Sequence, residues 1–396
     1  MRKVLLVTYH FPPSGAVAVY RMLGLVKHLP RFGWQPVVVA PPRVPWEPED
    51  QSLLAQVPAD TPIERVPFAE SFLGKIARRL APESHWLLEA RSACNRMIAE
   101  HEPHAILTSS PPGCVHLLGW WLHRRTQLPW LADFRDPWVT NHVIDRWTLG
   151  KRLDLWLEGK VMQHATALIA NTPLNQEGWA SVYPQHAQKI AIIPNGFDPQ
   201  SPGTAVPGNT SRVTILHAGE FYSGRDPRPF FGALQAASHL PVDVDLLGRK
   251  TETLCDFPAE IRQRGLDGRV RLLGQVPYAD ALDRMKRADI LLLVHTPGYR
   301  VGVPAKLYEY LGAGRPILAL ADPDSDIAWV LRESKVLHRI APLRDVARIG
   351  SALSELIGEI RAGGAAVPDP DALLQFTREA MARRVAELLD RQSLKR

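Results

Sequence analysis

Short apolar runs rich in β-branched residues alternate with longer stretches of helical pattern along most of the chain. Parallel strands need long crossover connections, usually helices, so this alternation is typical of sheets built from βαβ units. It predicts an α/β protein. The strands expected in the first half are Val4–Thr8, Pro36–Ala40, Ala105–Thr108, Trp130–Asp133, Ala167–Ala170 and Ile190–Ile193; those in the second half are Val213–His217, Val242–Leu247, Val270–Leu273, Ile290–Val294 and Ile317–Leu320.

One stretch without periodicity separates the two sets of strands. Residues 199–211 are dense in proline, glycine and small polar residues, a composition typical of a linker between domains. We therefore expect two doubly wound, Rossmann-like domains, 1–198 and 212–371, followed by a terminal segment, 372–396, with one more helix. Ligands of open parallel sheets bind beyond the carboxyl ends of the strands, so we expect the loops at those ends to face a shared cleft.

The composition excludes several other classes of protein. Of the 396 residues, 45% are hydrophobic and 22% are charged, which is typical of a globular chain. No apolar run is long enough to span a bilayer, and Met1-Arg2-Lys3 leads directly into the first predicted strand, so we expect neither a membrane anchor nor a signal peptide. The net charge of +6 is compatible with an anionic ligand or a membrane surface, and no motif supports nucleic-acid binding.

The cysteines and the acidic runs argue against disulfides and metal. Cys94, Cys114 and Cys255 are far apart and lack metal-ligand spacing, which favours a reducing cytoplasm. The aspartates of 243–245 alternate as in a strand, and those of 322–326 are suited to cap a helix. We therefore expect no metal ion and no cofactor.

The segment from Gly302 to Pro316 is the most informative for function. Its Gly-Val-Pro loop precedes a short helix that Gly314 ends, and Pro304 suits a helix start, where free backbone N–H groups bind anions. Lys306 opposes the helix dipole in the first turn, which suggests a phosphate. Glu309 lies about one turn later on the same face, where a carboxylate is suited to accept hydrogen bonds from a ribose diol. An ordinary surface pair of Lys306 and Glu309 is the alternative.

Charged residues also follow the strand Trp130–Asp133, in the sequence Asp133-Phe134-Arg135-Asp136-Pro137-Trp138. Charges at the end of a buried strand are costly unless they are paired or used, and such ends are where sites assemble. Two interpretations remain open. Either Arg135 and Asp136 belong to a site, or Asp133, Arg135 and Asp136 form a buried network that only shapes the loop.

Four segments together resemble glycosyltransferase family 4, whose members are retaining enzymes of the GT-B fold. They are Phe11-Pro12-Pro13, Asp133 to Trp138, Ile193 to Asp198, and Gly302 to Pro316. The Asp-Phe-Arg-Asp-Pro-Trp sequence is similar to the signature of one subset of the family. The resemblance implies transfer of a sugar from a nucleoside diphosphate donor, with UDP favoured, to an acceptor hydroxyl. It also implies that a terminal helix, roughly Ala372 to Asp390, packs back across the domains.

The resemblance places the donor in the second domain. Lys306 and the helix start would hold its diphosphate and Glu309 its ribose, although the family's first glutamate falls on Val301 here. The family also has an arginine and a lysine in the loop after Val213–His217, where this chain has Glu220 and Arg225. The expected donor-binding residues are Gly219, Arg225, Arg249, Lys250, Gln275, Val276, Gly302, Val303, Pro304, Lys306, Leu307 and Glu309, with Gly15 from the first domain.

Several of these residues have a simpler interpretation. Arg225 is the main phosphate cation expected from its loop, and Arg228 is the reserve. A surface pair of Arg225 with Asp226 is the alternative. Gly15 is expected to let the backbone approach the donor diphosphate, but it equally suits a plain strand-to-helix turn. In the first domain, the resemblance favours Asp136 near the acceptor hydroxyl or the donor sugar, with Arg135 orienting it or neutralising phosphate.

The acceptor is less constrained than the donor. A saccharide, a lipid-linked sugar and a small molecule are all consistent with the sequence. The stretch Phe72–Leu80 has an apolar face opposite Lys75, Arg78 and Arg79, as a helix lying on the inner face of an anionic membrane would; packing on a sheet is the alternative. We expect a cytoplasmic glycosyltransferase of the hexosyl or N-acetylhexosaminyl type, acting in cell-surface polysaccharide or glycoconjugate synthesis. A GT-B nucleotide-sugar epimerase, or a non-catalytic nucleotide-sugar-binding subunit, remains as an alternative.

Overall fold

The computed structural model describes residues 1–44, 47–68, 82–139, 148–199, 212–221, 224–248, 256–364 and 369–394. The chain forms two compact units, one made of Met1–Gly196 and Arg378–Arg396 and the other of Phe197–Thr377. The chain therefore passes between the units twice, after Gly196 and after Thr377, where the sequence predicts boundaries at 198 and 371. Most of the predicted linker, 200–211, lies outside the described residues.

The first unit is a seven-stranded parallel sheet of order β3-β2-β1-β4-β5-β6-β7. Its strands are β1 (Arg2–Thr8), β2 (Trp34–Ala40), β3 (Ile63–Arg65), β4 (Ala105–Ser110), β5 (Trp130–Phe134), β6 (Ala167–Ala170) and β7 (Ile190–Ile192). The helical segments are α1 (Val19–His28), η1 (Leu29–Phe32), α2 (Gln51–Leu54), α4 (Pro82–His101), α5 (Val115–Thr126), α6 (Thr148–His164), α7 (Pro173–Val182), η2 (Pro184–Lys189) and α15 (Arg378–Ser393).

Both faces of this sheet are buried. Leu5 and Val7 of β1 belong to one apolar cluster, and Val4 and Leu6 belong to another. A parallel sheet covered by helices on both faces needs apolar residues at successive positions, which is why these strands read as continuous apolar runs.

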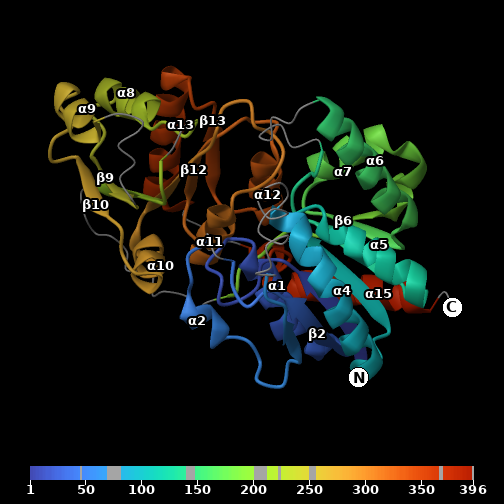
Figure 1. Cartoon of the computed structure of the whole chain (residues 1–396). Coiled ribbons are helices and arrows are strands. Elements are labelled where there is room, and N and C mark those ends of the chain that lie inside the picture. The colour runs from blue at the N-terminus through green and yellow to red at the C-terminus, as the bar shows by residue number, and fades with distance from the viewer. Residues whose placement is uncertain are drawn as a thin grey trace. The chain divides into compact units, whose positions relative to one another are not determined.

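The last helix, α15, belongs to the first unit. Met381, Val385 and Leu389 are buried in the cluster that contains the α1 residues, and the red helix α15 lies among elements of the first unit in Figure 1. Trp34 Nε1 donates to Asp390 Oδ1 at 2.7 Å, which fixes the far end of the helix on β2. A Cβ added at Gly24 would lie 3.1 Å from Arg378 Cβ, so the glycine permits the close approach of α1 and α15.

The second unit is a six-stranded parallel sheet of order β10-β9-β8-β11-β12-β13. Its strands are β8 (Val213–Ala218), β9 (Val242–Leu247), β10 (Val270–Gly274), β11 (Ile290–Val294), β12 (Ile317–Leu320) and β13 (His338–Ala341). The helical segments are α8 (Arg228–Ala236), α9 (Phe257–Gln263), α10 (Tyr278–Arg287), α11 (Ala305–Ala313), α12 (Asp326–Ser334), α13 (Val346–Glu359), η3 (Ile360–Gly364) and α14 (Pro370–Leu374). Apolar clusters again lie on both faces of the sheet.

The structure confirms the predicted α/β class, and it adds two edge strands that the sequence does not predict. Ile63–Arg65 is three residues long and half-buried, and His338–Ala341 begins with two partly buried basic residues. Edge strands need fewer apolar residues than central strands do, so their sequences are harder to recognise as strands. The predicted membrane-surface stretch, Phe72–Leu80, lies outside the described residues. Within the described part of the chain, no helix combines the length and the apolar character that crossing a membrane requires.

Candidate functional site

Helix α11 places Lys306 at the carboxyl end of the second sheet. The helix begins at Ala305, after Pro304 in an extended conformation, and it ends at Gly314, whose φ is +66°. Tyr310 fixes the helix against two strands, since its hydroxyl accepts from the Ala218 N–H at 3.0 Å and donates to the Leu292 carbonyl at 3.2 Å. Lys306, one turn earlier, is thereby directed toward the end of β8.

Lys306 lies directly against the turn that follows β8. A Cβ added at Gly219, whose φ is +135°, would lie 2.2 Å from Lys306 Nζ, so no other residue fits there with the lysine in this place. The pKa of Lys306 is lowered to about 8, mainly by burial and also by Arg225, while Glu309 acts in the opposite direction. The depressed pKa means that the surroundings of Lys306 stabilise its ammonium less well than water does. A bound anion would supply the negative charge that stabilises the ammonium.

A neutral histidine faces the Lys306 ammonium. His217 Nδ1 lies 2.9 Å from the Leu292 carbonyl, so it must carry the proton, and the unprotonated Nε2 lies 3.5 Å from Lys306 Nζ. Burial first, and then Lys306, keeps the pKa of His217 well below its ordinary value. The His217 ring stacks on Phe221 with centroids 4.2 Å apart. The histidine therefore orients the ammonium without adding charge.

A second buried histidine shows the same electrostatics. Burial lowers the pKa of His295, which follows β11, to about 4, and the nearby cations Arg225 and Lys306 contribute to the shift. The positive charge of Arg225 thus lowers the pKa values of His217, His295 and Lys306. The ends of β8 and β11 and the first turn of α11 share one positive region.

Asp226, the predicted surface partner of Arg225, forms an ion pair with Arg228. Asp226 Oδ2 lies 2.6 Å from Arg228 Nη2, and the carboxylate also accepts from the Arg228 backbone N–H at 2.9 Å. Arg228, the second candidate for binding the donor phosphate in this loop, is therefore already neutralised by Asp226.

Three glycines bring the loops after β8, β9 and β10 together. Gly248 N–H donates to the Gly274 carbonyl at 2.8 Å, and Gly219 N–H donates to the Leu247 carbonyl at 2.7 Å. A Cβ added at Gly248 would lie 2.3 Å from the Gly219 carbonyl oxygen. Gln275 and Val276 follow Gly274 directly, so the structure brings them to the same sheet edge, with Gln275 exposed. Arg249 and Lys250 lie outside the described residues.

Glu309 projects toward the start of α10. Tyr278, which is 48% exposed, donates its hydroxyl proton to Glu309 Oε1 at 3.1 Å. In the loop before α11, Gly302 has a φ of +90°, and its N–H donates to Asp326 Oδ2 at 2.7 Å. Val303 is partly buried and Leu307 is buried. Leu307 therefore packs α11 on the sheet, and its side chain is not available to a ligand.

The first unit also gathers charge at the carboxyl ends of its strands, but there the charges are paired. Arg21 of α1 and Asp133 of β5 form an ion pair at 2.7 Å with both side chains 1% exposed. Asp133 also accepts from Ser109 Oγ at 2.8 Å, and Arg21 also donates to Asn171 Oδ1 at 3.2 Å. One of the two interpretations left open by the sequence places Asp133 in a network with Arg135 and Asp136. The structure pairs Asp133 with Arg21, which the sequence does not single out.

Arg135 and Asp136 lie beyond this network. Asp136 is exposed and Arg135 is partly buried. Burial lowers the pKa of Arg135, and Asp136 raises it. The Arg135 carbonyl accepts from Asn171 Nδ2 at 2.8 Å, so Asn171 links the loop to the buried ion pair. His10, from the loop after β1, lies close enough for Arg135 to lower its pKa, although burial contributes more.

Gly15 lies in a loop and not in the first turn of a helix, because α1 begins only at Val19. Its N–H donates to the Pro48 carbonyl at 2.7 Å, and a Cβ added to it would lie 3.2 Å from that oxygen. Glu47 ties the same loops together, accepting from Ser14 Oγ at 2.5 Å and pairing with His10 at 3.0 Å. The close approach to Pro48 accounts for glycine at this position.

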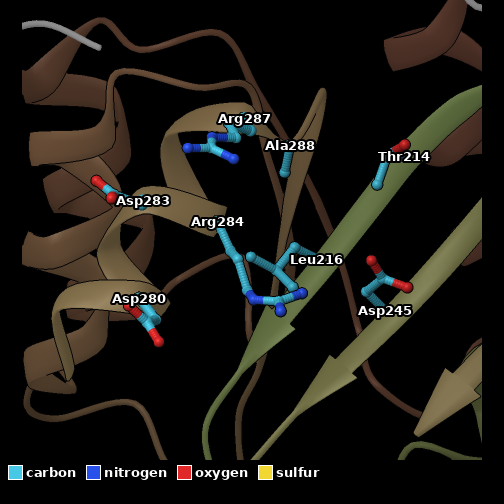
Figure 2. A pocket seen from close by; sticks show the side chains of 8 residues that line it. All are labelled: Thr214, Leu216, Asp245, Asp280, Asp283, Arg284, Arg287 and Ala288. Atoms are coloured by element: carbon cyan, nitrogen blue, oxygen red, sulfur yellow. The ribbon is translucent and has the colours of Figure 1, made fainter. Parts of the chain in front are cut away.

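Figure 2 shows a separate pocket of about 470 Å³ between α10 and the strands β8 and β9. Arg284 extends from α10 over Leu216, while Asp280 and Asp283 lie along the helix. Asp245 on the opposite wall is already paired with Arg271 at 2.6 Å. The lining of the pocket contains both acidic and basic side chains. Among the described residues, it includes none of the predicted donor-binding residues.

Two parallel α/β units with charged loops at the carboxyl ends of their strands define a protein of the GT-B fold. Residues 15–196 match the sequence model of the family described as "Glycosyl transferase 4-like domain". The matched residues lie within the first unit. A sequence comparison with curated proteins gives no match.

Solved structures resemble the chain over its whole length. The Anabaena protein HepE, in complex with UDP and glucose, has a TM-score of 0.68 at 17% identity and covers 99% of this chain and 100% of its own. A glycosyltransferase from Rickettsia africae has a TM-score of 0.70 at 11% identity, covering 99% and 98%. A putative UDP-N-acetylglucosamine 2-epimerase from Listeria monocytogenes has a TM-score of 0.61 at 11% identity, covering 100% and 97%. At these identities the likeness establishes the fold.

Proposed function

We propose that the protein is a retaining glycosyltransferase that moves a sugar from a UDP-sugar to an acceptor hydroxyl. The observation that carries this proposal is Lys306, a lysine of depressed pKa at the first turn of α11, held against Gly219 and beside Arg225. The glycosyltransferase 4-like match of residues 15–196 and the UDP and glucose of the HepE complex support it.

The second unit would hold the donor. Negative charge develops on the diphosphate as the bond to the sugar breaks, so cations that are already in place stabilise the transition state more than the ground state. Lys306 and Arg225 supply that charge, and the glycine turns at 219 and 248 let backbone approach the phosphates. Glu309, held by Tyr278, would accept hydrogen bonds from the ribose.

The first unit would hold the acceptor. In the proposed reaction the acceptor oxygen bonds to the anomeric carbon on the face that the diphosphate leaves, and the departing phosphate oxygen takes the acceptor proton. Asp136 then positions the acceptor and Arg135 neutralises phosphate charge, without a protein base or a metal ion. We propose a saccharide acceptor, free or lipid-linked, of the kind used in cell-surface polysaccharide synthesis.

Nucleotide binding can be tested before the sugar is known. Titration of UDP by calorimetry should give binding that Lys306→Ala and Arg225→Ala each weaken. Arg262→Ala removes one exposed positive charge from the same unit and is the matched control. If both site variants bind UDP as wild type does, Lys306 and Arg225 do not contact the nucleotide.

The reaction type needs a second experiment. The protein is incubated with a panel of nucleotide sugars, with and without saccharide acceptors, and products are followed by mass spectrometry and sugar analysis. Acceptor-dependent release of UDP with a new glycoside of retained anomeric configuration supports the transferase. The likeness to the putative epimerase makes sugar isomerisation the second candidate, and an isomer formed without acceptor would establish it. UDP binding with neither product would instead favour a non-catalytic binding subunit.

A further inference from the structure

The loop that follows β5, residues 135–139, is anchored by a carboxyl group from the interior of the first unit. Val139 N–H donates to Glu158 Oε2 at 3.0 Å, and Glu158 of α6 is 0% exposed. The other anchors are Asn171, which donates to the Arg135 carbonyl at 2.8 Å, and the packing of Trp138 on Gly113, where an added Cβ would lie 2.4 Å from the indole ring. This loop carries both Arg135 and Asp136.

The second carboxyl oxygen of Glu158 faces a tyrosine. Tyr183 Oη lies 3.2 Å from Glu158 Oε1 and also 3.2 Å from the Leu155 carbonyl oxygen. A phenol has one proton to donate, so it cannot fully satisfy both acceptors. When Glu158 is protonated the conflict disappears, because Oε1–H donates to Tyr183 and Tyr183 donates to Leu155. The hydrogen-bond geometry therefore favours the neutral acid.

We propose that Glu158 is a positioning residue for the 135–139 loop, and that ionisation of its carboxyl loosens the loop. The proposal deepens the proposed function, on which it rests for the role of Arg135 and Asp136. The loop supplies only backbone N–H groups of Trp138 and Val139 to the carboxyl. Among the described residues, the titratable groups that face it are Asp154, on the same helix, and Tyr183, from the segment after α7.

The electrostatics agree with this geometry. The pKa of Glu158 is raised to about 7, mainly by burial and also by Asp154, while the hydrogen bonds from the Val139 N–H and the Tyr183 hydroxyl act in the opposite direction. Opening of the loop would let water reach the carboxyl and return its pKa toward the ordinary value near 4.3. At a pH between the two pKa values, about 4.3 in the open state and about 7 in the closed state, the open state therefore binds fewer protons than the closed state. Opening is therefore favoured by up to about tenfold for each pH unit between about 4.3 and 7, and the effect levels off above about pH 7.

Hydrogen exchange of the 135–139 amides measures loop opening without any assay of activity. In the wild type we expect the protection factor of the Val139 amide, corrected for intrinsic exchange, to fall about tenfold between about pH 6 and pH 8, with little further change at higher pH. Glu158→Gln keeps an oxygen for Val139 and a donor for Tyr183 but cannot ionise, so its protection factor should stay constant. Glu158→Asp cannot reach Val139, so protection should be lost at every pH.

The control is Glu177→Gln, an exposed carboxylate on neighbouring α7, which should follow the wild type. A Glu158→Gln protein with the pH dependence of the wild type would refute the proposal, as would full protection in Glu158→Asp. If all variants exchange alike, Glu158 does not anchor the loop.

Turnover provides the test of the functional role. If the proposed transferase activity is observed, Glu158→Asp should lower kcat at least tenfold and leave the affinity for UDP, which the second unit binds, unchanged. Equal losses in kcat and in the affinity for UDP would show general damage to the protein and contradict a positioning role. Absence of turnover in the wild type would contradict the proposed function, while the exchange experiment would still decide whether Glu158 controls the loop.

Discussion

The carboxyl ends of the two sheets hold charge in opposite ways. In the first unit, Arg21 and Asp133 are both buried and neutralise each other at 2.7 Å. In the second, Lys306 and Arg225 act on each other as like charges, and the polar side chains beside them, His217 and His295, have lowered pKa values that keep them neutral. A charge that is neutralised within the protein serves the fold, whereas two like charges that lie close together favour an anionic ligand.

The largest expected effect is on the paired charges. Arg21→Met leaves Asp133 buried without its cation, which should destabilise the protein by about 3–5 kcal/mol. Urea denaturation followed by circular dichroism measures the change. The exposed pair of Arg31 and Glu379, 3.1 Å apart on the same unit, offers the control, and Arg31→Met should cost less than about 1 kcal/mol. Equal losses in the two variants would remove the distinction between buried and exposed pairs.

The opposite pattern is expected for Lys306, which lies beside the like charge of Arg225. Lys306→Met should weaken UDP binding by about tenfold to a hundredfold, the equivalent of about 1.4–2.8 kcal/mol. It should leave the melting temperature in the absence of UDP unchanged or raise it, because a partly buried cation is removed from beside Arg225. Thermal unfolding with and without UDP separates the two effects. A marked loss of stability without ligand would mean that Lys306 has a structural role like that of Arg21.

The pH dependence of UDP binding should reflect the same lysine. Its pKa is about 8 in the free protein, and a bound diphosphate favours the ammonium, so the complex holds the proton to higher pH. Affinity should therefore be constant below pH 8 and fall by up to about tenfold per unit above it. The diphosphate, with a second pKa of about 6, is already ionised in this range. Lys306→Arg should bind UDP without this dependence, and a wild-type affinity that stays level from pH 7.5 to pH 9.5 would contradict the assignment.

The smallest expected effect is that of Gly15→Ala in the first unit, and Gly248→Ala in the second unit is its comparison. Gly15→Ala brings a Cβ within 3.2 Å of the Pro48 carbonyl oxygen and should cost about 1 kcal/mol or less. Gly248→Ala should cost more, about 1–3 kcal/mol, because φ is +144° and the Cβ would lie 2.3 Å from the Gly219 oxygen. Chemical denaturation compares them. A more severe loss in Gly15→Ala would show that the first loop is the more tightly constrained.

Much of the fold follows from the sequence because its signals are local. Central parallel strands are continuous apolar runs, and Lys306 stands out since it opposes the dipole of its own helix. Arg21, Glu158 and His217 are different. Each has partners far away in the sequence, such as Asp133 for Arg21 and Leu292 for His217, so nothing in the neighbouring residues indicates the contact. A charged residue inside an apolar face, as Arg21 is within α1, is the signal that would have found it.

The return of α15 to the first unit has a consequence for how the chain folds during synthesis. The residues of the second unit leave the ribosome before α15 does, so the second unit can complete its core first, although its sequence comes later than most of the first. Until α15 arrives, the surface that Met381, Val385 and Leu389 will cover stays exposed. The nascent protein therefore passes through a state in which its later half is finished and its earlier half is not, and chaperones that recognise apolar surface would act in that interval.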